Sequence, residues 1–142
     1  MINGINSREM ILEILLEIEE GEHSHVAIRN ALSKYQFLPK QDRAFITRVC
    51  EGTLEYRIQI DYIINSFSKV TVDKMKPAIR EILRSAVYQL KYMDSVPDSA
   101  VCNEAVKLAQ RKGFYNLKPF VNGVLRTIAR EMDQVRFPQK ED

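Results

Sequence analysis

The residue types that most often perform chemistry are sparse in this chain and stand apart from one another. Cys50 and Cys102 each lie in an apolar stretch without an adjacent histidine, so neither has the partner that an activated thiolate needs. His23 and His25 are separated by one residue, and no third ligand follows at the spacing of a metal site. We therefore expect no metal site and no nucleophilic catalysis. The thiols are expected to be buried and reduced, as in a cytoplasmic protein, with a disulfide between them as the less favoured alternative.

Cofactor chemistry needs sequence features that are missing as well. The five glycines are scattered, so there is neither a phosphate-binding loop nor a dinucleotide fingerprint. No serine stands in a nucleophile-elbow sequence. No catalytic residue and no cofactor-binding residue is predicted within this segment.

The basic residues form the informative pattern. The net charge is only +2, but residues 1–71 carry 8 Lys/Arg against 10 Asp/Glu, whereas residues 72–142 carry 13 against 9. No acidic residue lies between Glu104 and Glu131. That window holds six cations: Lys107, Arg111, Lys112, Lys118, Arg126 and Arg130.

The spacing of these cations predicts basic ridges on helices. Lys118, Asn122, Arg126 and Arg130 recur every fourth residue, which places them on one side of a helix. Further ladders of this kind are Lys107 with Arg111, and Lys76 with Arg80 and Arg84. Such ridges suit a phosphate backbone, because each neutralised phosphate releases condensed counterions. A solvated helix face is the alternative interpretation.

Other residues in this region are expected to serve the architecture. Phe114 and Tyr115 could stack on an unpaired base, but a role at the corner between two helices is favoured. Gly52 and Gly123 interrupt helical patterns, which indicates close helix–helix approach. Asn103 and Asn122 are expected to form hydrogen bonds between helices.

Apolar residues recur at helical spacing through most of the chain, and no segment alternates like a strand. We predict an all-α fold, a single compact bundle of about seven helices, occupying residues 1–134, with residues 135–142 as a linker or tail. The first helix is expected from a cap at Ser7 to near Gly21, the second from a cap at Ser24, and the third from Pro39. The fourth is expected through Ile60–Phe67 after a break near Arg57, and the fifth from Pro77 to about Tyr92. The sixth is expected from Pro97 to Gly113, and the seventh from about Leu117. No run of about 18 apolar residues suggests a membrane span.

Two motifs in the second half resemble the NusB family, an all-α RNA-binding fold. They are the run Asn103–Glu104–Ala105–Val106–Lys107–Leu108–Ala109 and the run Phe120–Val121–Asn122–Gly123–Val124–Leu125–Arg126. The stretch Leu83 to Tyr92 and the Val96–Pro97 that follows are similar to the same family. The resemblance covers about residues 7–132.

Other residues resemble one branch, the N-terminal domain of RsmB/Sun-type 16S rRNA cytosine-C5 methyltransferases. They are Asp42–Arg43, Glu51–Gly52–Thr53–Leu54, Asp61 and the tail Arg136–Phe137–Pro138–Gln139–Lys140. This resemblance implies an auxiliary domain that binds RNA, 16S rRNA in particular, and is not itself catalytic. S-adenosylmethionine and the nucleophile would then belong to a downstream catalytic domain.

The resemblance implies RNA contacts at Arg8, Lys118 and Phe120. Charge placement adds Lys107, Arg111, Lys112, Arg126 and Arg130. Free-standing NusB typically has an arginine-rich start to its first helix, but here only Arg8 is present, followed by Glu9 and Glu13, which argues against high-affinity RNA binding of the antiterminator type. Two alternatives remain open: a free-standing NusB-type transcription antitermination factor that pairs with a ribosomal protein, and a helical protein–protein interaction module.

Overall fold

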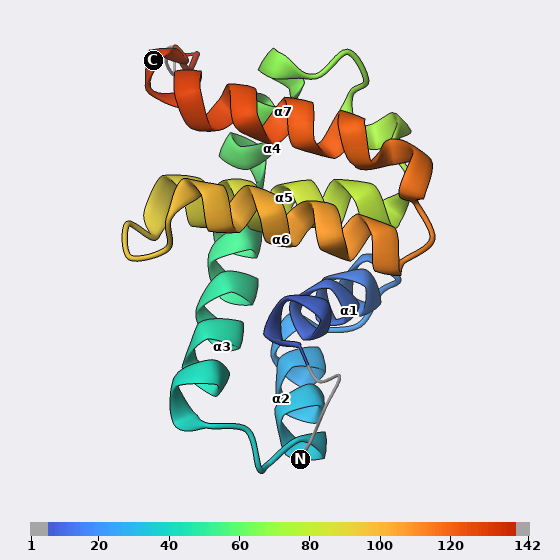
Figure 1. Ribbon diagram of the computed structural model, residues 1–142. Helices are drawn as coiled ribbons and strands as arrows, with labels where there is room; N and C mark the ends of the chain where they lie inside the picture. The colour runs from blue at the N-terminus through green and yellow to red at the C-terminus, as the bar shows by residue number, and fades with distance from the viewer. Residues whose placement is uncertain (1–5, 139–142) are drawn as a thin grey trace.

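The computed structural model describes residues 6–138, and these residues form helices and turns without a strand (Figure 1). The α-helices are α1 (Ser7–Glu19), α2 (Ser24–Lys34), α3 (Lys40–Glu55), α4 (Arg57–Phe67), α5 (Pro77–Tyr92), α6 (Asp98–Arg111) and α7 (Lys118–Glu131). Three short 3-10 turns join or follow them: η1 (Val72–Lys74), η2 (Tyr115–Leu117) and η3 (Met132–Gln134). The prediction of an all-α fold with about seven helices is confirmed.

Helix α5 is the centre of the bundle. Every residue from Glu81 to Leu90 is buried, and α1, α3, α4, α6 and α7 all pack against this helix. Pro77 occupies its first turn, where a missing N–H costs no hydrogen bond. These five helices each bury apolar side chains, for example Leu15, Val49, Ile64, Leu108 and Leu125, whereas α2 packs against α1 and α3.

The helix ends differ from the predictions at two caps. Asn6, and not Ser7, caps α1, because its side-chain oxygen accepts hydrogen bonds from the backbone N–H groups of Arg8 and Glu9 at 2.8 and 3.2 Å. At α2 the cap position is His23, without a side-chain hydrogen bond, and Ser24 is already helical. Gly113 ends the α6 segment with a φ of +89°, as predicted for a glycine stop.

The two glycines within helices have different surroundings. A Cβ on Gly52 would overlap ring carbons of Tyr88, so α3 and α5 approach each other closely at this point. A Cβ on Gly123 would meet nothing within 4 Å. The expectation of close packing is confirmed at Gly52 and wrong at Gly123.

The residues after α7 turn back onto α4. The ring of Phe137 lies 5.4 Å from that of Tyr62, and the Tyr62 hydroxyl donates to the carbonyl of Arg136 at 3.1 Å. Residues 139–142 of the predicted linker lie outside the described residues, and the domain boundary at 134 stays a prediction. Within residues 6–138 no helix is both long and apolar enough to span a bilayer.

Candidate nucleic-acid interface

Helices α6 and α7 lie side by side and are joined by a short turn (Figure 1). Gly113 ends the α6 segment, and η2 leads directly into α7. The turn therefore sets the polar flank of α7 beside the polar flank of α6. The surface defined by Lys107 and Arg111 of α6 with Lys118, Arg126 and Arg130 of α7 is called the cation ridge below.

Two cations of the ridge are held by neutral amides. Arg126 donates from Nη2 to Oδ1 of Asn103 at 2.7 Å, and from Nε to Oδ1 of Asn122 at 3.1 Å. Lys118 donates to Oε1 of Gln110 at 2.7 Å. Because an amide oxygen carries no formal charge, these bonds orient the cations and leave their positive charge uncompensated.

The other ridge cations are little neutralised. Lys107 pairs with Glu104 at 3.4 Å, and Arg130 pairs with Glu131 at 3.2 Å, but both pairs are open to solvent. Exposed ion pairs of this kind are weak and easily exchanged. Arg111 is exposed and has no carboxylate partner among residues 6–138. The ridge therefore presents a positive surface.

One aromatic side chain adjoins the ridge. Tyr115 is 64% exposed, and the Lys118 ammonium lies 4.5 Å from the centre of its ring. Phe114 packs against the core. The favoured corner role therefore holds for Phe114, whereas Tyr115 leaves a ring face in solvent beside a cation, which suits stacking on a base.

Three predicted contact residues lie elsewhere. Lys112 faces α1 and pairs with Glu9 and Glu13 at 3.2 and 3.3 Å, so its charge is compensated. Burial lowers the pKa of Lys112, but hydrogen bonds to the two carboxylates outweigh it and the net shift is upward. Arg8 lies over the ring of Phe45 at 5.1 Å, at the start of α1. Phe120 is half-buried on the far flank of α7, in a small apolar hollow with Leu117, Ile79 and Val70.

The ladder predicted on α5 is not a binding surface. The Arg84 side chain is only 8% exposed and forms two parallel hydrogen bonds of 2.8 Å with Asp61 and one of 2.6 Å with Glu81. Arg80 pairs with Glu19. These arginines hold α5 against α4 and α1, and only Lys76 of that ladder is exposed.

The same cluster contains one carboxyl too many for its cations. Arg80 and Arg84 balance two carboxylates, while Glu19, Asp61 and Glu81 supply three. Burial raises the pKa of Glu81 to about 8, and its hydrogen bond to Glu19 adds to the rise. A neutral Glu81 that donates to the Glu19 carboxylate leaves the cluster balanced.

The residues considered for covalent or metal chemistry give no site. Cys50 and Cys102 are buried and unjoined, as expected, and burial raises the pKa of both thiols. In the part of the chain that the structure describes, no three His, Cys, Asp or Glu side chains gather as metal ligands would.

The predicted hydrogen bond between helices is confirmed at Asn103, which accepts from Arg126 of α7, and is wrong at Asn122, which accepts from Arg126 within α7. Gln110, which accepts from Lys118, carried no prediction. Asn103 and Gln110 are seven residues apart, so they share one face of α6, and that face lies toward α7. This spacing was the available signal.

The chain is similar to two kinds of known protein. A probable ribosomal RNA small subunit methyltransferase B of Bacillus subtilis is 35% identical over 124 residues, which are 87% of this chain and 28% of that protein. The chain thus spans under a third of this relative. A transcription antitermination protein NusB of Dictyoglomus thermophilum is 33% identical over 130 residues, covering 91% of this chain and 85% of that protein.

A solved structure of the antitermination factors NusB and NusE in complex with double-stranded RNA has the same fold. It superposes with a TM-score of 0.79 at 21% identity, covering 87% of this chain and 93% of the matched chain. The model of the NusB family matches residues 5–130. With seven helices in the same arrangement and a family match over most of its length, this chain belongs to the NusB family.

Proposed function

We propose that this domain binds RNA through the cation ridge of α6 and α7. The observation that carries the proposal is the pairing of Arg126 and Lys118 with amide oxygens instead of carboxylates. Such bonds fix the position of each cation and keep its charge available for a phosphate. Tyr115 at the end of the ridge supplies a ring face for an unpaired base.

The names of similar proteins support the same class of ligand. One relative is named as a ribosomal RNA methyltransferase, and a protein with this fold was solved in complex with RNA. In this proposal Arg8, Lys112 and Phe120 contribute less to RNA binding than the cation ridge does. Arg8 belongs to α1 and lies over Phe45, Lys112 is paired with α1, and Phe120 lies on the other flank of α7.

The finer proposal is an auxiliary, non-catalytic domain of a 16S rRNA cytosine-C5 methyltransferase in the cytoplasm. Its support is the match to 28% of a methyltransferase that is 35% identical over that part. S-adenosylmethionine and the cysteine nucleophile would then be supplied by a further domain, and this segment would hold the rRNA. Binding of this kind requires no cofactor here.

A second candidate is a free-standing antitermination factor that acts with a ribosomal protein. The match to 85% of a NusB protein, at 33% identity, favours it. The reading frame beyond codon 142 separates the two candidates. A methyltransferase domain encoded there supports the first, and a stop codon supports the second.

The experiment that tests RNA binding is a titration of a labelled 16S rRNA fragment at about 50 and 200 mM salt. If each of the five ridge cations displaces about one counterion from duplex RNA as it would from duplex DNA, affinity falls roughly 500-fold across this range. A domain that binds the fragment at neither concentration would contradict the proposal and support the protein–protein module.

A further inference from the structure

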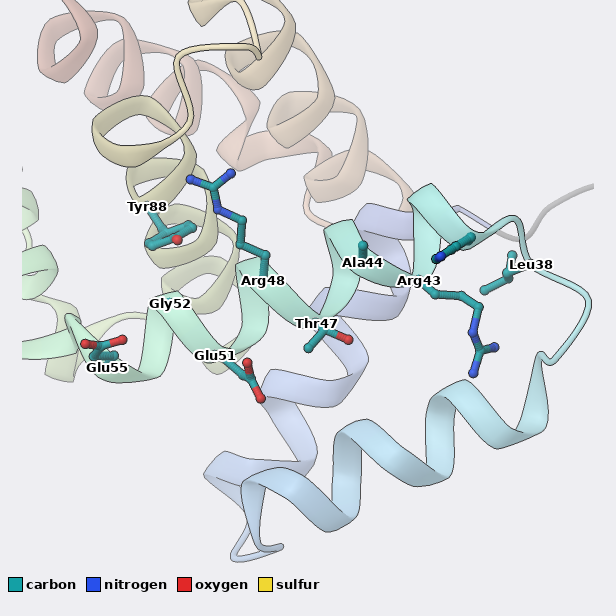
Figure 2. A pocket seen from close by; sticks show the side chains of 10 residues that line it. Leu38, Arg43, Ala44, Thr47, Arg48, Glu51, Gly52, Glu55 and Tyr88 are labelled. Carbon is teal, nitrogen blue, oxygen red and sulfur yellow. The ribbon is translucent and has the colours of Figure 1, made fainter.

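The outward face of α3 forms an open hollow that the RNA-binding proposal does not use (Figure 2). Its volume is about 820 Å³, and it extends along most of the helix and reaches Tyr88 of α5. Lys40, Ala44, Thr47, Glu51 and Glu55 follow one another at helical spacing along this face. They are called the α3 face below.

The charges along this hollow are separated by sign. Lys40 and Arg43 line its first half, Arg48 lies just past its middle, and Glu51 and Glu55 line the rest of its second half. Arg43 and Arg48 donate only to backbone carbonyls. None of these five side chains forms an ion pair among residues 6–138.

This order of charges is unfavourable for the helix itself. Cations near the N-terminus and anions near the C-terminus oppose the helix macrodipole. Glu51 and Glu55 are also four residues apart, where like charges repel. Asp42 in the first turn offsets part of this effect, but the charged side chains that line the hollow gain no stability from α3 itself.

The sequence along the α3 face is complementary to its own reverse. Lys40 lies as many residues before the middle of α3 as Glu55 lies after it, and the same holds for Ala44 and Glu51. The middle of the helix lies between Thr47 and Arg48. When two such helices lie antiparallel, each basic half meets an acidic half. A two-fold axis at the midpoint produces this contact twice, as an isologous interface requires.

We propose that the α3 face is a self-association surface on which a second copy of this chain lies antiparallel. Lys40 of each copy then faces Glu55 of the other, and Arg48 lies one turn from Glu51 of the other. The small side chain of Ala44 allows the helices to approach. Two exposed apolar side chains lie near the ends of α3: Phe37, at 53% exposure, three residues before it, and Ile58, at 90% exposure, in the first turn of α4.

The test is sedimentation of the 142-residue chain over a concentration series at low salt. The unmodified chain should form dimers, and their dissociation constant should rise with salt because the interface is electrostatic. Lys40→Glu and Glu55→Lys should each raise that constant by about tenfold or more, since each places like charges opposite each other at two symmetric points.

A mixture of the two variants supplies the decisive comparison. A Lys40→Glu chain and a Glu55→Lys chain complement each other at both points, so the mixture should form heterodimers although each variant alone is monomeric. The double variant Lys40→Glu/Glu55→Lys should regain self-association. Far-UV circular dichroism verifies that every variant is folded. An unmodified chain that stays monomeric at millimolar concentration, or folded variants that fail to associate when mixed, would overturn the proposal.

Discussion

The guanidinium of Arg126 on α7 donates a 2.7 Å hydrogen bond to the side-chain oxygen of Asn103 on α6. This bond joins the two helices across the cation ridge, and the Arg126 charge is not cancelled by it. An asparagine at position 103 thus links α6 to α7 and leaves the positive charge of Arg126 uncompensated.

Asn103→Asp should weaken RNA binding more than Asn103→Ala does. The aspartate would pair with Arg126 and offset its charge, which should reduce the salt slope of binding by about 1. With alanine, Arg126 keeps its bond to Asn122 and its charge, so the slope should stay unchanged. Equal slopes for the two variants, measured by titration at several salt concentrations, would contradict the role given to this amide.

Gly52→Ala should destabilise the fold. The new methyl group would enter the ring of Tyr88, and overpacking of this kind costs about 1–3 kcal/mol. Gly123→Ala is the matched control, because that position is open and helical, and it should gain about 0.5–1 kcal/mol. Urea unfolding of both variants measures the two effects, and a neutral Gly52→Ala would argue against the close approach of α3 and α5.

Arg84→Met should lower the free energy of unfolding by about 3–5 kcal/mol. The substitution leaves the Asp61 carboxylate without its cation, and the neutral Glu81 carboxyl without the donor of its 2.6 Å hydrogen bond, in a largely buried cluster. Lys76→Met, at the exposed N-cap position just before the same helix, should change stability by less than about 0.5 kcal/mol. Thermal and urea unfolding compare the pair, and similar stabilities would show that the cluster does not hold α5 in place.

Glu81 should make the domain less stable as the pH rises from about 5 to 8. Its pKa is raised to about 8 in the fold, so the native state keeps a proton that the unfolded state loses above the ordinary value of 4.5. The stability from this group is therefore complete in acid and is lost as the pH approaches 8, at most about 1.4 kcal/mol per pH unit.

Glu81→Gln should flatten this decrease of stability with pH, because glutamine stays neutral at every pH. Glu19 affects stability in a separate pH range. Burial raises its pKa, but the hydrogen bond from Arg80 and the other contacts lower it on balance, so its effect appears below pH 4.5. Urea titrations at pH 5, 6, 7 and 8 test the assignment. A slope in the variant as steep as in the unmodified chain would assign the proton to another group.

The fold was predictable from the sequence because its helices carry regular apolar stripes. Pro77 and Gly113 mark helix ends by rules that depend only on local backbone geometry. The predicted N-cap of α1, Ser7, is one residue after the observed cap, Asn6. Both residue types are good caps, and only the path of the chain selects between them.

The binding surface was only partly predictable. Arg80 with Arg84 and Arg126 with Arg130 have the same spacing, yet Arg84 is buried among carboxylates and Arg130 is exposed. Periodicity shows which residues share a helix face, but it does not show what that face meets. The carboxylates around Arg84 come from α1, α4 and α5, and those opposite Lys112 come from α1. Such pairings become visible only when distant segments are placed together.

The affinity of an Arg126→Glu/Arg130→Glu variant for a 16S rRNA fragment at about 50 mM salt tests the cation ridge most directly. The double reversal should leave helicity nearly unchanged and lower the melting temperature only slightly, since Arg130 is exposed and the half-exposed Arg126 loses only its hydrogen bonds to Asn103 and Asn122. RNA binding should fall by at least about tenfold, and the salt slope should decrease by about 2. A folded variant that binds the fragment as tightly as the unmodified chain would show that the ridge is a solvated surface and that RNA is held elsewhere.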